Sequence, residues 1–145
     1  MKRKKNLHKL LNLQYLKVTN KTLSVGRKDL PKLYCDINEY PDFIALYDEP
    51  GLYHKTDKTC VAFFKYDSVF NGRYGLAEAI RWDDHVQQQF FRNRFEGVRY
   101  MCSPDNTIAH DLQKFEIDYR LAQSREVSIW LTMNVNTTVI PLITY

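Results

Sequence analysis

The sequence predicts an α/β protein built on a small parallel β-α-β-α-β layer. Three short runs rich in β-branched and aromatic residues predict strands, at residues 59–66, 98–102 and 137–145. Two longer segments between them place apolar residues at steps of three and four, which is helical spacing. Strands joined through helices of this length must run parallel, with right-handed crossovers. Two such crossovers make half of a doubly wound sheet or three-eighths of a barrel.

The first strand and first helix follow from the clearest local signals. Residues 59–66 are largely apolar and are followed by Asp67, which is typical of a strand buried on both faces. A helix is expected within residues 76–95, because four residues there are spaced along one apolar face. These are Ala79, Trp82, Val86 and Phe90. Asp83 or Asp84 is an alternative helix start, since aspartate caps helix N-termini, and Gly97 ends the pattern.

The second helix is expected after a loop of capping residues at 103–107. Its apolar positions are Ile108, Leu112, Phe115, Tyr119 and Ala122, and it could run as far as Met133. The third strand, residues 137–145, contains Pro141, which removes one backbone donor. No further unit follows to cover the edge of this strand. We therefore expect residues 1–58 or a second subunit to cover it, which leaves open a homodimer through the exposed third strand.

Length and charge suggest one domain, residues 1–145, with three parts. Residues 1–32 form a basic arm of net charge +9, with a short amphipathic helix expected at 6–16. Residues 33–58 form an acidic, aromatic and irregular segment, in which 43–47 could be a short strand or a helix. Residues 59–145 form the β-α-β-α-β core, and the irregular, partly helical N-terminal segment is expected to cover one edge of its sheet. The chain outside the arm carries a net charge of −5.

Cysteine usage and hydropathy indicate a cytoplasmic protein. The three cysteines are odd in number and match no zinc spacing, so we expect free thiols, a reducing compartment and no cofactor. The basic start has no apolar core behind it, which argues against a signal peptide. No apolar stretch approaches the roughly 20 residues that cross a bilayer.

Four short motifs resemble those of an uncharacterised family found in phages, plasmids and integrated elements of Gram-positive bacteria. They are FFKYDSVF at 63–70, YMCSPDNT at 100–107, IDYRLAQSR at 117–125 and VIPLITY at 139–145. The resemblance covers about 85 residues. It departs from the family at Asn106-Thr107, where an aromatic residue and serine are usual, and family members continue past the third strand. It implies a mobile-element origin, a host bacterial cytoplasm and the α/β fold, but no activity.

The sequence suggests three possible functions, and the third in order of preference is that of an enzyme. Ligands of parallel α/β folds bind at the carboxyl ends of strands, where Asp67 and Asp105 are expected. These carboxylates could hold a divalent metal for phosphoester or nucleotide chemistry, with Arg120 contacting an anion. Asp67 could instead end its strand in an Asx-turn and Asp105 could cap a helix, and we favour these structural roles over catalysis. We therefore expect no catalytic or metal site and favour a non-enzymatic protein.

The two other readings follow from the split charge. The arm could bind DNA or RNA phosphates through Lys2, Arg3, Lys4, Lys5 and Lys9. Alternatively, an acidic and aromatic face could occupy a basic groove on a protein that handles nucleic acid. Its residues would be Asp42, Tyr47, Asp48, Glu49, Trp82, Asp83 and Asp84. We expect this last function, a protein of a phage or mobile element that binds such a partner, including inhibition of a host defence nuclease of the CRISPR type.

Overall fold

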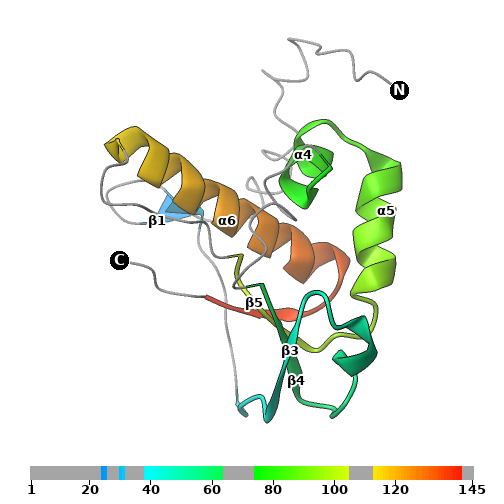
Figure 1. Cartoon of the computed structure of the whole chain (residues 1–145). Coiled ribbons are helices and arrows are strands. Elements are labelled where there is room, and N and C mark those ends of the chain that lie inside the picture. Colours follow the sequence, from blue (N-terminus) through cyan, green and yellow to red (C-terminus); the bar gives the residue numbers. More distant parts are fainter. Residues whose placement is uncertain (1–23, 26–29, 32–37, 64–73, 105–112, 142–145) are drawn as a thin grey trace.

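The fold is a four-stranded parallel sheet with helices packed against it (Figure 1). The computed structural model describes residues 24–25, 30–31, 38–63, 74–104 and 113–141. The sheet has the order β3-β4-β5-β6. Its strands are β3 (Phe43–Leu46), β4 (Thr59–Ala62), β5 (Tyr100–Cys102) and β6 (Thr138–Ile140). The predicted α/β class and the parallel pairing are therefore confirmed.

Helices form the connections between the last three strands. Helices α4 (Leu76–Arg81) and α5 (His85–Arg94) join β4 to β5, and α6 (Lys114–Asn134) joins β5 to β6. A one-turn 3-10 helix, η1 (Pro50–Leu52), lies between β3 and β4. Earlier in the chain, β1 (Ser24–Val25) and β2 (Leu30–Pro31) pair antiparallel, and β2 lies against α6.

Strand β3 adds a fourth strand to the three expected in the core. It lies where the sequence left open a short strand or a helix, and the strand alternative is confirmed. It pairs in parallel with β4 from Phe43 opposite Thr59 to Leu46 opposite Ala62. A run of four apolar residues is too short to show a period, so its sequence could not distinguish strand from helix. Residues 43–46 of the N-terminal segment thus cover the β4 edge. In the described part of the chain, no strand pairs with the outer edge of β6.

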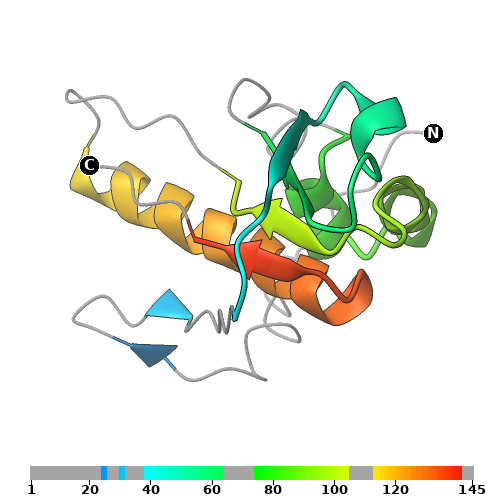
Figure 2. The same ribbon diagram turned by 90° about the horizontal axis from the view of Figure 1, so that it is seen from below.

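The two faces of the sheet differ in what covers them. One face contributes Ala45, Val61, Met101 and Val139 to the main core, together with side chains of all three helices. The opposite face gathers a smaller cluster of Cys60, Ala62, Tyr100 and Cys102. Because the strands follow chain order, right-handed crossovers place every connecting helix on the same side. Figure 2 shows the strands in front and α6 behind them.

The predicted helix at 76–95 is two helices, as its alternative start at Asp84 anticipated. Helix α4 ends at Arg81, and Asp84 caps α5 by accepting a hydrogen bond from the Gln87 amide at 3.1 Å. The break shifts the helical phase, so the stripe expected to be buried does not continue. Val86 is 83% exposed and Phe90 is 47% exposed, whereas Gln88 and Phe91 are buried. The expectation that Val86 and Phe90 face the core is wrong.

Helix α6 buries different residues from those predicted. Tyr119, expected on the apolar face, is 50% exposed, and the fully buried stretch is residues 126–131. Every residue of that stretch is buried because α6 contacts β6, α4 and β2 on different sides. A helix that is covered on all sides has no single apolar stripe. The spacing of the apolar residues therefore predicted the wrong buried face for α6. Among the described helices, none combines the length and apolar character needed to cross a membrane.

Candidate protein-binding surface

The turn between α4 and α5 holds one of the predicted acidic and aromatic groups in a defined shape. The Trp82 indole donates to the Glu78 carboxylate at 2.7 Å, which fixes the end of α4. Asp83 has a φ of 55°, in the left-handed region that aspartate tolerates better than most residues. Asp84 then caps α5. Two partly exposed carboxylates therefore lie at the N-terminus of a ten-residue helix, where the helix dipole favours negative charge.

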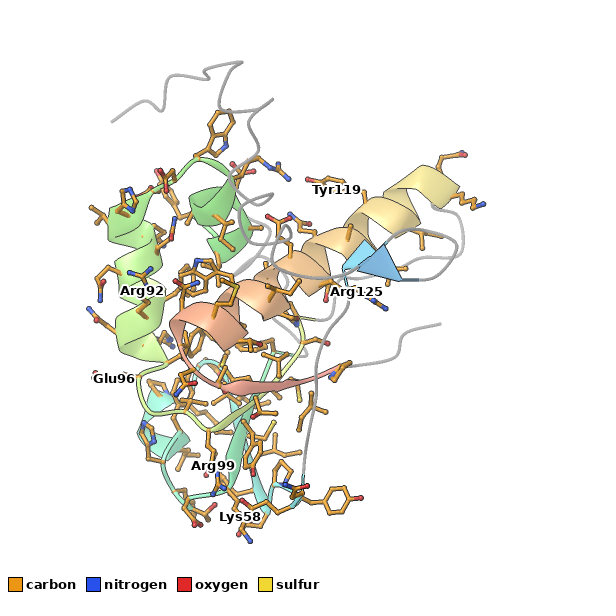
Figure 3. All side chains as sticks on the ribbon, turned by 180° about the vertical axis from the view of Figure 1, so that it is seen from behind. Lys58, Arg92, Glu96, Arg99, Tyr119 and Arg125 are labelled. Atoms are coloured by element: carbon orange, nitrogen blue, oxygen red, sulfur yellow. The ribbon has the colours of Figure 1, made fainter. Side chains whose placement is uncertain are left out.

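Two apolar side chains lie on the outer face of α5, directly after this turn. Val86 and Phe90 are one helical turn apart, so they share a side of the helix. The opposite side is anchored: the Gln88 side chain donates to the Ala79 carbonyl at 3.0 Å and accepts from the Trp130 indole at 3.3 Å. In Figures 1 and 3, α5 runs along one margin of the molecule. Its outer face is therefore open.

We define the α5 surface as Asp83, Asp84, Val86 and Phe90. The prediction from sequence named the two acids but missed the two apolar residues, because it assigned them to the core. The Gln87 side chain donates to the Tyr74 carbonyl at 2.7 Å, which ties the chain entering α4 to the first turn of α5. The geometry is that of a rigid helix presenting apolar groups beside negative charge. This combination suits recognition of another protein.

The second predicted group, Asp42, Tyr47, Asp48 and Glu49, lies around β3 and η1. Asp42, Asp48 and Glu49 are exposed, and Asp42 accepts a hydrogen bond from the Thr56 hydroxyl at 2.5 Å. Glu49 precedes η1 and accepts from the Leu46 amide at 3.3 Å. Tyr47 differs from the acids because its ring packs inward, 5.9 Å from Phe63 and 6.0 Å from Phe95 between ring centres. Tyr47 therefore serves the core more than the surface.

An arginine from α5 accounts for the position of Tyr47. The Arg94 guanidinium lies 4.3 Å from the centre of the Tyr47 ring and donates to the Tyr47 carbonyl at 2.9 Å. The Tyr53 hydroxyl donates to the same carbonyl. Burial raises the pKa of Tyr47, and it raises the pKa of Tyr53 to about 12, with Arg94 opposing both shifts. Both phenols are therefore neutral at physiological pH.

Basic residues from elsewhere reduce the negative charge at this end of the sheet. Glu39 pairs with Arg99 and lies 3.5 Å from the Lys58 ammonium. The Lys55 ammonium lies 5.1 Å from the centre of the Phe43 ring. Together with Arg94 at Tyr47, these cations lie against the segment that the sequence alone showed as acidic. They offset part of its negative charge.

The two predicted groups lie at opposite ends of α5. Arg94, in the last turn, contacts Tyr47, whereas Asp84 caps the first turn. Ten helical residues span about 15 Å, so the groups do not form one patch. Of the two, the α5 surface places its acids beside exposed apolar groups, and its Asp83 carboxylate lies 3.5 Å from the His85 imidazole. We therefore place the candidate site there.

Glu126 is the most perturbed acid among the described residues, and sequence reasoning missed it. It is 6% exposed on α6, and burial raises its pKa to about 8, with Arg81 acting in the opposite direction. Arg81 also donates to the Tyr119 hydroxyl at 2.5 Å and to Glu78 at 3.4 Å. This carboxyl is therefore largely enclosed by protein.

The remaining predicted residues divide between the described part of the chain and the rest. Arg120 is a partly exposed residue of α6. Asp67 and Asp105, and the arm residues Lys2, Arg3, Lys4, Lys5 and Lys9, lie outside the described residues. Within the described ranges, no three potential metal ligands come together.

Comparison of the sequence with protein families and with curated proteins finds no match, and comparison of the fold with solved structures finds none either. The resemblance to the phage and plasmid family therefore stays a prediction.

Proposed function

We propose that this protein acts without catalysis, by binding a protein that handles nucleic acid. The observation that carries the proposal is the α5 surface, where Val86 and Phe90 are exposed one turn apart beside Asp83 and Asp84. Burying a valine or a phenylalanine side chain stabilises a complex by about 1.5–3 kcal/mol each. Burial of both side chains on one helix would therefore contribute substantially to the affinity of the complex.

The charge of the surface favours a basic partner. Asp83 and Asp84 stand at the entrance to α5, where the Asp83 carboxylate lies 3.5 Å from the His85 imidazole. A groove lined with lysine and arginine, of the kind that holds a nucleic-acid backbone, complements these carboxylates and would be steered towards them. In a mobile element, a protein of this kind would inhibit a host nuclease by occupying its nucleic-acid groove.

Capture from bacterial lysate by the full chain tests the proposal with matched variants. The double variant Val86→Lys/Phe90→Lys removes both anchors and adds like charge for a basic partner. The control, Ile44→Lys, changes a residue that is 55% exposed on β3, away from α5. We expect the wild type and the control to retain the same protein, and the double variant to bind it at least about a hundredfold more weakly. Equal retention by all three would refute this surface.

The carboxylates and the partner class need separate variants. Asparagine tolerates the left-handed conformation and caps helices as well as aspartate, so Asp83→Asn/Asp84→Asn removes charge while keeping the turn. We expect weaker capture with a smaller dependence on salt. Added duplex DNA should release the captured protein, because both would compete for one basic groove. Release by neither DNA nor salt would exclude a nucleic-acid groove as the target.

A further inference from the structure

Two thiols meet on the sheet face opposite the helices. Cys60 is in β4 and Cys102 is the last residue of β5, and their Sγ atoms are 3.6 Å apart. Both are free cysteines, 3% and 7% exposed respectively. The register pairs Cys60 with Tyr100, so Cys102 lies two residues further along the neighbouring strand and on the same face. Sequence spacing, with 42 positions between them, does not show this contact.

The 3.6 Å between the sulfurs is too long for a disulfide and is the distance of two reduced thiols in contact. A disulfide holds its sulfurs about 2.05 Å apart, so closure requires them to approach by about 1.5 Å. An offset of two residues between neighbouring strands places the two Cα atoms about 8 Å apart, beyond the roughly 4.4–6.8 Å of a disulfide. Closure therefore also requires the backbone to move at Cys102, where β5 ends. The surrounding residues Ala62 and Tyr100 are buried and complete a small apolar cluster.

The two thiols are chemically unequal. The hydrogen bond with Cys60 lowers the pKa of Cys102, although burial acts in the opposite direction. The same hydrogen bond, together with burial, raises the pKa of Cys60. Cys102 therefore ionises first, and it is also the more exposed of the two. A thiolate attacks oxidants, whereas a thiol does not.

We propose that Cys60 and Cys102 form a thiol oxidation site that closes to a disulfide with hydrogen peroxide as the oxidant. The Cys102 thiolate attacks one peroxide oxygen, the O–O bond breaks, and the departing hydroxide takes up a proton to become water. This leaves a sulfenic acid on Cys102. The Cys60 sulfur then attacks the Cys102 sulfur, the S–O bond breaks, and a second water leaves with the Cys60 proton. Two thiols are oxidised and one peroxide is reduced to two waters.

Closure would act on the junction between β5 and α6. Directly after Cys102, the Ser103 amide donates to the Ile140 carbonyl at 2.9 Å, and the Pro104 carbonyl accepts from the Ser124 hydroxyl at 2.5 Å. A bond that pulls Cys102 towards β4 therefore moves the residues that hold β6 and α6 in place. Peroxide is small enough to reach a thiol of low exposure, which a bulky disulfide oxidant is not.

Intact mass of the full chain after peroxide treatment at neutral pH, without reductant, tests the proposal. We expect the wild type to lose two hydrogen atoms, dithiothreitol to restore them, and peptide mapping to find Cys60 linked to Cys102. The variant Cys35→Ser should give the same product, because Cys35 takes no part. A wild-type chain that keeps its mass, or a bond that includes Cys35, would overturn the proposal.

Single variants test the order of the two steps. With Cys60→Ser, no disulfide can form, the serine hydroxyl can still donate to Cys102, and dimedone should label the sulfenic acid on Cys102. With Cys102→Ser, the serine oxygen can still accept from Cys60, and labelling of Cys60 should be at least about tenfold slower, because Cys60 is the less ionised thiol. Serine preserves the hydrogen bond on which the difference between the thiols rests, and circular dichroism verifies the fold of each variant. Faster labelling of Cys60 than of Cys102 would contradict the assigned roles.

Discussion

The Tyr100 hydroxyl donates a hydrogen bond to the Glu39 carboxylate at 3.0 Å, across 61 positions of sequence. Glu39 also binds Arg99 and lies near Lys58, so one acid joins the residues that lead into β4 and β5. The segment before β3 is thereby fixed across the amino end of the sheet, as Figure 2 shows. Four predictions about stability follow from contacts of this kind.

Removing the Tyr100 hydroxyl should weaken the fold most at neutral pH. The hydrogen bond from Tyr100, with Arg99 and Lys58, lowers the pKa of Glu39 below its ordinary value of 4.5. A carboxyl whose pKa is lower in the folded state stabilises the fold at pH values above its unfolded pKa. This stabilisation is lost as the pH falls through the folded pKa. Tyr100→Phe should therefore lower the urea midpoint at neutral pH and flatten its decline in acid. Tyr40→Phe, at an 86% exposed position, is the control and should change neither.

Replacing Glu126 by glutamine should stabilise the protein at alkaline pH. Its pKa rises from 4.5 unfolded to about 8 folded, so the folded state holds a proton that the unfolded state has lost. Wild-type stability therefore falls by about 1.4 kcal/mol per pH unit between those values and not beyond them. Urea unfolding of Glu126→Gln should lack this component and show a gain on the order of 4 kcal/mol above pH 8. The control Glu96→Gln, at an exposed position, should behave as wild type. If the stability of Glu126→Gln showed the same pH dependence as that of wild type, the raised pKa of Glu126 would be refuted.

Loss of the cap on α5 should destabilise the fold by about 1 kcal/mol. Asp84→Ala removes the acceptor for the Gln87 amide, which then has no partner in the first turn. Asp84→Asn preserves a side-chain oxygen at that place and is the matched control, with a much smaller loss expected. Urea unfolding of both variants measures the difference. Equal losses would mean that the charge of Asp84, rather than its capping bond, stabilises α5.

Arg94→Lys should cost about 1–2 kcal/mol even though the charge is retained. A planar guanidinium stacks on the Tyr47 ring while donating to the Tyr47 carbonyl, and an ammonium cannot do both. The comparison is Arg92→Lys, since the Arg92 guanidinium lies further from its ring, 5.7 Å from the centre of Trp130. Thermal unfolding should rank Arg94→Lys below Arg92→Lys. The reverse order would contradict the role given to Arg94.

The continuous apolar runs that predicted β4 and β5 reflect strands that are buried at every residue. β6 is only partly buried, and its β-branched residues predicted it. β3 has only four residues, with Ile44 exposed, and its strand character comes from pairing with β4 rather than from its own pattern. Local sequence cannot supply a partner that lies across the fold.

Only part of the candidate site could be predicted from the sequence, because the exposure of its apolar residues depends on the fold. Asp83 and Asp84 were visible as acids beside Trp82, and Asp84 as a cap. The exposure of Val86 and Phe90 depends on the left-handed turn at Asp83, which resets the phase of α5. Apolar periodicity assumes one uninterrupted helix, so it assigned both residues to the core. The pairing of Arg94 with Tyr47, 47 positions apart, gave no sequence signal at all.

The strand order also bears on how the chain reaches this structure. Since β3, β4, β5 and β6 are neighbours in the sheet and successive in the sequence, each new strand adds to an existing edge. No strand has to insert between two that are already paired. A ribosome delivers the chain in the same direction, so the sheet can grow during synthesis, one strand at a time. On this pathway the partial sheet presents a single growing edge, and β6 completes it last.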